Sequence, residues 1–248
     1  MARKWWTLLA VCVATFMLLL DITVVNVALP DIQKSLGASL SSLQWVVDAY
    51  SLTLAAFLLT AGSLADRIGR RRVFAVGFLI FTVASFLCGI SPNATALNLA
   101  RGLQGIGGAA MFATSLALIA QEFQGKERGT AIGAWGATIG GAVAIGPLVG
   151  GALTEGLGWE WIFFVNVPIG IGALVLTETQ LVNVKASDPQ PIDWIGVVTF
   201  SLALFGLIFG SFIRGSVRVG SSGEKSLPQI RFPDLARGSA GQVIDHEE

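Results

Sequence analysis

Seven long apolar runs constrain the fold of this 248-residue chain more than any other feature of its sequence. A helix needs about 20 apolar residues to cross the hydrocarbon of a bilayer. Runs of about that length occupy residues 7–29, 43–64, 73–91, 95–120, 130–154, 161–180 and 194–213. The first run is too long for a signal peptide and is followed by no convincing small-residue cleavage site. The sequence therefore predicts an all-α, polytopic membrane protein.

The composition excludes an ordinary soluble domain. Hydrophobic residues make up 53% of the chain and charged residues 13%, against about 25% charged residues in soluble domains. Sixteen basic residues balance sixteen acidic ones, so the chain has no broad basic surface for a nucleic acid. Cys12 and Cys88 lie in apolar runs, where packing is the expected role. We therefore expect no metal, no cofactor and no nucleic-acid partner.

The cationic residues predict the orientation in the membrane, because Lys and Arg beside membrane spans are retained on the cytoplasmic side. With the N-terminus inside, the short outer loops through the sixth span hold Lys34, against nine cations in cytoplasmic segments. Those nine are Arg3, Lys4, Arg67, Arg70, Arg71, Arg72, Lys126, Arg128 and Lys185. We therefore expect a multi-pass protein of the cell membrane, in contact with lipid, with a cytoplasmic N-terminus.

Three ionisable residues lie within the predicted spans, where each costs about 2.5–3.5 kcal/mol on insertion scales. Asp21 lies in the first span, Asp48 in the second and Arg101 in the fourth. At about 1.5 Å per residue, they lie roughly 13, 8 and 9 Å below the outer ends of their helices. If these helices face one cavity, a guanidinium and two carboxylates share it and lower the cost of burying one another.

These polar residues also have structural interpretations. Asp48 is favourable in the first turn of a helix at the headgroups, Arg101 can extend to the interface, and Gln104 and Asn26 suit hydrogen bonds between helices. Asp21 is flanked by apolar residues on both sides and is harder to explain in this way. Functionally, burial favours the protonated carboxyl and a nearby cation favours the ionised one. A conformational change that separates the two therefore loads or releases a proton.

Glycines concentrate in the fifth span, where small residues four apart allow close helix packing and Pro147 favours a kink. The residues concerned are Gly133, Gly136, Gly140, Gly141, Gly146, Pro147, Gly150 and Gly151. Glycines also occur in the connection at residues 62–72, where Asp66 stands beside four arginines. These arginines suit contact with anionic lipid, and Asp66 is suited to pair with them or with a neighbouring helix.

Four segments resemble motifs of the major facilitator superfamily, specifically of the fourteen-span drug:proton antiporters that include quaternary-ammonium and multidrug exporters. Residues 62–72 resemble its loop signature, and residues 97–105 its span-four signature. Residues 136–151 resemble the antiporter signature of span five, and residues 20–30 the span-one motif of exporters. Residues 44–50, 161–168 and 193–196 also resemble that group, so the resemblance covers about residues 5–213.

The resemblance implies alternating access by a six-helix bundle, built as an inverted repeat of three plus three helices, with substrate passing between two such halves. Roles in proton and substrate coupling are implied for Asp21, Asp48, Arg101 and Gln104. A cytoplasmic gate is implied for Gly62, Asp66, Arg67, Gly69, Arg70 and Arg71. An exporter-specific helix interface is implied for Gly136, Gly140, Gly146, Pro147, Gly150 and Gly151.

The resemblance and the composition together predict that the chain has three parts. Residues 1–182 form the six-helix bundle, residues 183–213 a linker and a seventh helix, and residues 214–248 a tail. The tail is rich in Gly, Ser and charged residues and lacks apolar periodicity, so we expect it to be disordered. We interpret it as a truncated or frame-shifted end.

The predicted function is proton-coupled efflux of small hydrophobic or cationic drugs by alternating access, with this chain as an incomplete half. The alternative is a nontransporting truncated membrane protein, or a half-transporter that needs a second chain. Catalysis gains no support from the sequence. No nucleophile and base occur at an interpretable spacing, and the glycine runs lie inside apolar spans rather than after a strand, where a phosphate-binding loop would begin.

Overall fold

The computed structural model describes residues 3–182, together with Gly196, Thr199, Leu202, Ala203, Gly206 and Gly210. The bundle predicted for residues 1–182 is thus almost fully described. Apart from those six isolated positions, the expected linker and seventh helix at 183–213 lie outside the described residues, as does the tail at 214–248.

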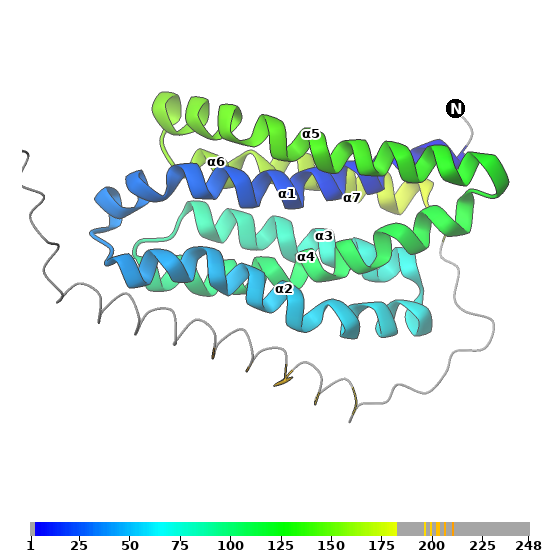
Figure 1. The fold of residues 1–248 in the computed structure, drawn as a ribbon, viewed down its shortest axis with the longest axis horizontal. Coiled ribbons are helices and arrows are strands. Elements are labelled where there is room, and N and C mark those ends of the chain that lie inside the picture. The colour runs from blue at the N-terminus through cyan, green and yellow to red at the C-terminus, as the bar shows by residue number, and fades with distance from the viewer. Residues whose placement is uncertain are drawn as a thin grey trace, which may run out of the picture. The chain divides into compact units, whose positions relative to one another are not determined.

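The described part of the chain is all-helical (Figure 1). Six segments are long and apolar enough to cross a membrane, with α6 and α7 together forming one of them. The helices are α1 (Arg3–Leu36), α2 (Leu40–Ile68), α3 (Arg70–Gly89), α4 (Ala94–Glu122), α5 (Gly125–Leu157), α6 (Trp161–Phe164) and α7 (Asn166–Gln180). The first six predicted spans are therefore confirmed: four helices extend beyond both predicted ends, α3 begins three residues earlier and ends two residues earlier than predicted, and the last span has an internal interruption. Pro30 and Pro147 both lie inside helices that continue beyond them.

Short polar segments separate the helices where the sequence supplies capping residues. The Ser39 side chain accepts a hydrogen bond from the Ser42 amide (3.2 Å), and the Asn93 side chain accepts one from the Ala96 amide (2.9 Å). These contacts satisfy amides that have no partner in the first turn of a helix. Gly69 ends α2 with φ of +107°, a backbone conformation that favours glycine. The reversal at Gly69 places the arginines that follow it at one end of the bundle.

Helix α4 packs against α2, α3 and α1, and its glycines make this close approach possible. A Cβ atom at Gly107 would lie 2.6 Å from the Phe81 amide nitrogen and 2.8 Å from the Gly77 carbonyl oxygen, both on α3. A Cβ at Gly105 would overlap the Tyr50 carbonyl and the Thr53 side chain on α2. Small residues at such contacts let membrane helices pack backbone to backbone. Gly105 and Gly107 therefore allow the close contact of α4 with α2 and α3.

Buried apolar side chains fill the spaces between these helices. One cluster includes Phe74, Phe78 and Phe81 of α3 with Met111 of α4, all fully buried. The outer helices are much more open, since 11% of the apolar stretch of α5 is buried, against 61% in each of α1, α3 and α4. Leu99 and Leu148 are about three-quarters exposed, at 73% and 75%. Such apolar surface suits contact with lipid or with further protein.

Replacing Gly107 with alanine is expected to lower the unfolding free energy by about 1–3 kcal/mol, because the added methyl group has no space between α4 and α3. Thermal unfolding of the purified chain in detergent measures the effect. Gly133→Ala is the matched control, since a Cβ at Gly133 meets nothing within 4 Å. Equal melting temperatures for the two variants would contradict the account of α4 packing.

Candidate functional site

An ion pair between Asp21 of α1 and Arg101 of α4 lies inside the bundle. The pair is formed by Nη1 of the Arg101 guanidinium and Oδ2 of the Asp21 carboxylate. Asp21 is 3% exposed and Arg101 is 1% exposed. Extension of Arg101 to the membrane interface is therefore excluded as the explanation of its position. The acid of the first span and the base of the fourth span thus meet inside the bundle.

Neutral side chains complete the hydrogen bonds of this pair. Gln104 Nε2 donates to Asp21 Oδ1 (2.9 Å) and to Ser85 Oγ of α3 (2.8 Å), while Gln104 Oε1 accepts from Arg101 Nη1 (2.7 Å). Asn166 Nδ2 of α7 donates to Asp21 Oδ1 at 3.5 Å. Gln104 thus contacts both charges at once. Buried charges are tolerated when hydrogen bonds of this kind replace water.

The guanidinium has further partners on α2 and α6. Arg101 Nε donates to the Val46 carbonyl oxygen (2.9 Å). The Arg101 Cζ atom lies 4.3 Å from the centroid of the Tyr50 ring and 5.8 Å from that of Phe163. Aromatic faces attract cations, and more strongly when water is excluded. We call the set Asp21, Ser85, Arg101, Gln104 and Asn166, with the Tyr50 and Phe163 rings, the polar centre.

Asp48 does not join the polar centre. Its side chain is half-buried on α2, and it makes no hydrogen bond or ion pair with another residue in the described part of the chain. Of the two carboxylates that were expected to share a cavity with the guanidinium, Asp21 alone pairs with it. A similar depth in the membrane does not fix the direction in which a side chain points.

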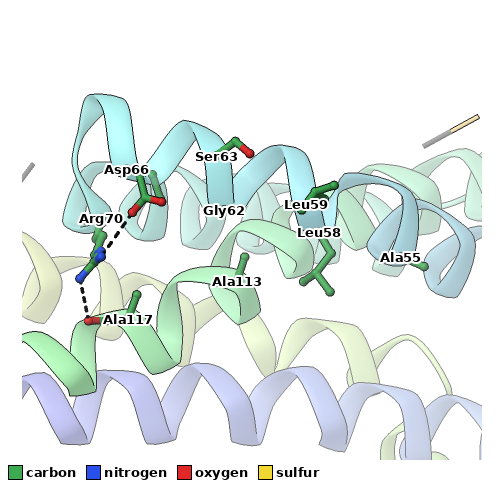
Figure 2. Close-up of a pocket in the computed structure, with 10 residues that line it drawn as sticks. Ala55, Leu58, Leu59, Gly62, Ser63, Asp66, Arg70, Ala113 and Ala117 are labelled. Carbon is green, nitrogen blue, oxygen red and sulfur yellow. Dashed lines mark hydrogen bonds and ion pairs between the residues drawn. The ribbon is translucent and has the colours of Figure 1, made fainter. Parts of the chain in front are cut away.

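At the α2–α3 turn, the predicted gate residues form two separate contacts. Asp66 pairs with Arg70 at 3.3 Å, and Arg70 Nη1 also donates to the Ala117 carbonyl oxygen of α4 at 3.2 Å (Figure 2). Arg71 pairs with the Glu178 carboxylate of α7 and donates to the Glu178 carbonyl oxygen at 2.8 Å. These contacts tie α3 to α4 and to α7 at this end of the bundle.

Arg67, the remaining predicted gate cation, is exposed and has no hydrogen-bond partner within the described segments. Gly62 lines a hollow of about 660 Å³ beside Asp66 and Arg70, with Leu58 and Leu59 farther along α2 (Figure 2). No atom lies within 4 Å of a Cβ built at Gly62. The small size of this residue therefore keeps the hollow open rather than bringing two described helices together.

The span-five motif divides into two faces. A Cβ at Gly146 would overlap the Thr23 side chain of α1, and one at Gly150 would lie 3.2 Å from Val24 Cα. Trp135 Nε1 also donates to Thr15 Oγ1 across the same α1–α5 contact, at 2.8 Å. By contrast, Cβ atoms at Gly136, Gly140 and Gly151 would meet nothing within 4 Å, and Pro147 is exposed. Close packing thus explains two of the motif glycines and leaves one face of α5 free.

Several members of these contacts could not be recognised as site residues from the sequence. Ser85, Tyr50 and Phe163 are ordinary residues in apolar runs, and nothing in their local sequence shows that they face a charge. Glu178 lies at the end of its span, where solvation alone would explain it. Asn166 had a signal, since an asparagine two residues before Pro168 interrupts an apolar run. A polar residue at such a helix break is a reasonable candidate for a buried contact.

The fold and the polar centre define a polytopic membrane protein that holds a charge pair inside its helical bundle. The chain belongs to the Major Facilitator Superfamily, a family of membrane transporters, whose family model matches residues 11–217.

Several relatives carry the names of export or resistance proteins. The chain is 43% identical over 209 residues to the Tetracenomycin C resistance and export protein of Streptomyces glaucescens, covering 84% of this chain and 39% of that protein. It is 48% identical over 174 residues to the Puromycin resistance protein pur8 of Streptomyces alboniger, covering 70% and 35%. The chain therefore spans less than half the length of these relatives.

Solved structures support the same fold. The chain superposes on a crystal structure of the peptide transporter POT in complex with sulfate with a TM-score of 0.65, at 14% identity, covering 90% of this chain and 47% of the other. It also superposes on a bacterial homologue of the human lysosomal transporter Spinster with a TM-score of 0.61, at 21% identity, covering 78% and 47%. Both comparisons extend over about half of a complete transporter.

Breaking the buried ion pair from one side is expected to destabilise the bundle more than removing both charges. Asp21→Leu or Arg101→Met leaves an unpaired charge and is expected to lower the unfolding free energy by about 3–5 kcal/mol. The double variant removes both charges and is expected to regain most of that loss. Unfolding of the purified chain in mixed detergent and SDS micelles measures all three. Additive losses in the double variant would show that the two residues act independently.

Proposed function

We propose that this chain forms one bundle of a proton-coupled exporter of small hydrophobic or cationic compounds, of the fourteen-span drug:proton antiporter group. The observation that carries the proposal is the buried Asp21–Arg101 pair, because ionisable groups at membrane depth mark ion and proton pathways. The names of the export and resistance relatives support the substrate class. In the cell membrane, the N-terminus and the α2–α3 turn would face the cytoplasm.

Asp21 is the proposed proton acceptor. A proton that binds its carboxylate removes the negative charge that pairs with Arg101. Arg101 keeps its bonds to the Val46 carbonyl of α2 and to Gln104 of its own helix. Protonation therefore weakens the attachment of α1 to α4 and leaves the attachment of α2 to α4 in place. A selective change of this kind can bias the bundle between two arrangements.

Asp48 is the proposed contact for a cationic substrate. The Asp21 carboxylate is fully buried and occupied by Arg101, Gln104 and Asn166, so it is closed to a bulky cation in this arrangement. Asp48 is half-buried and carries no such partners in the described bundle. The two carboxylates that sequence analysis grouped together would then have separate roles, one for the proton and one for the drug.

The contacts at the α2–α3 turn suit a cytoplasmic gate. Asp66–Arg70 and Arg71–Glu178 are partly exposed, and such pairs contribute little stability each. They can therefore open and close at low cost during transport. The hollow beside Gly62 and the free face of α5 provide surface for a second bundle to complete the pathway.

A second possibility is that the chain transports nothing alone and functions only with another chain. The open α5 surface favours this form of the proposal, since a bundle working alone would leave that face to lipid. Crosslinking in native membranes distinguishes a half-transporter, which functions with another chain, from a protein that transports nothing. A defined homodimer or heterodimer indicates a half-transporter, whereas monomer alone indicates a nontransporting protein.

Asp21→Asn is expected to abolish proton-driven efflux while leaving membrane insertion unchanged, because the amide cannot take up the proton. Arg101→Lys keeps the charge but loses the planar fork that contacts Asp21 and Val46, and is expected to reduce efflux about tenfold or more. Everted vesicles that contain the chain, alone and with the remaining part of the tetracenomycin exporter, measure dye transport under an imposed pH gradient. Unchanged transport by Asp21→Asn would remove the proposed role.

Asp48→Asn is expected to reduce transport of a cationic dye about tenfold while leaving transport of a neutral hydrophobic compound within about twofold, because one charge contact contributes about 1–2 kcal/mol. The same vesicles provide the measurement. Glu155→Gln, at an exposed position near the end of α5, is the matched charge-neutralising control. Equal losses for cationic and neutral substrates would contradict a charge-recognition role for Asp48.

A further inference from the structure

The sixth membrane span is broken next to the polar centre. Helix α6 ends at Phe164, and α7 begins at Asn166. Pro168 explains the break, because its ring displaces the carbonyl four residues earlier, that of Phe164, and it has no amide hydrogen to donate. The first turn of a new helix accepts proline without this penalty. The interruption is the single residue Val165, whose backbone angles stay helical, and it lies beside the buried charges.

The break brings two side chains to the ion pair. Phe163, at the end of α6, is fully buried with its ring facing the Arg101 guanidinium. Asn166, at the start of α7, is 2% exposed, and its amide nitrogen lies 3.5 Å from Asp21 Oδ1. A second contact fixes α7 one turn later, since a Cβ at Gly170 would overlap the Thr82 side chain of α3. Asn166 is therefore held in place by backbone packing.

We propose that Asn166 is a positioning residue for proton uptake: its amide hydrogen bond stabilises the ionised form of Asp21 and makes α7 responsive to the charge of that carboxylate. The inference rests on the proposed function of Asp21 as proton acceptor. With Arg101 and Gln104, Asn166 is the third donor on this carboxylate, and donors to an ionised carboxyl disfavour its protonation. Loss of the charge weakens all three contacts together.

The other groups around Asp21 do not provide a neutral hydrogen-bond donor from α7. Arg101 of α4 supplies the opposing charge, and Tyr50 of α2 stacks on that guanidinium. Cys88 of α3 donates to Gln104 Oε1 at 3.7 Å. Helix α5 approaches α1 at this level through Gly146, which has no ionisable group. Among the described helices, α7 thus contacts the carboxylate through a neutral donor alone.

Infrared titration of the full chain in lipid nanodiscs tests the proposal without requiring transport. The band of the protonated Asp21 carboxyl is identified by its absence in Asp21→Asn. Asn166→Leu is expected to raise the pH at which half of Asp21 is protonated by about half to one unit, as loss of one long hydrogen bond implies. Asn166→Gln, which keeps the donor, is expected to shift it by less than half as much.

Thr177→Val is the matched control, because Thr177 is a fully buried polar residue of the same helix whose hydroxyl donates to the Ala173 carbonyl oxygen. It is expected to leave the titration unchanged. If Asn166→Leu fails to insert, Asn166→Ala removes the amide without added bulk and should shift the titration in the same direction. An unmoved titration in a folded Asn166 variant would overturn the proposal. Efflux by Asp21→Asn tests the proposed function separately, so the two failures are distinguishable.

Discussion

The cost of removing two charges from water shapes the centre of this bundle. Asp21 and Arg101 are almost completely buried, and neither could remain so without the other. Satisfying them requires donors and acceptors from several helices, which is why Gln104, Ser85 and the Val46 carbonyl converge there. The charge pair therefore fixes how the helices around it are turned. Apolar packing alone would not fix these rotations, because it tolerates many rotations of a membrane helix.

The close packing of the helices brings the partners of the ion pair within hydrogen-bonding distance. The glycines of α4 bring α2 and α3 close enough for Arg101 to reach the Val46 carbonyl and for Gln104 to reach Ser85. Gly146 and Gly150 bring α5 against the side of α1 that carries Thr23 and Val24. Helix α1 is thus attached to α5 by close packing and to α4 by charge. A change in charge at Asp21 acts on one of these attachments and not on the other.

The sequence predicted the six described spans because the thickness of a bilayer sets a length that apolar runs must match. It also selected Asp21 and Arg101, since a charge at membrane depth needs a reason. It could not place Asp48, because the distance along a helix does not give the direction of a side chain. For the same reason, the sequence could not show that Tyr50, Ser85 and Phe163 face the ion pair. Asn166 and Pro168 together carried a usable signal, which becomes clear once the broken span is seen beside the ion pair.

Loss of the charge at Asp21 is expected to loosen α1 from α4 while α2 stays attached to α4. Spin labels at exposed positions near one end of the bundle test it directly, with Lys34 on α1, Ser41 on α2 and Thr95 on α4 replaced by labelled cysteines after Cys12 and Cys88 are changed to serine. Pulsed distance measurements compare the chain with and without Asp21→Asn. We predict a broader or longer distance between α1 and α4 in the variant and an unchanged distance between α2 and α4. Identical distributions for both pairs would contradict the account.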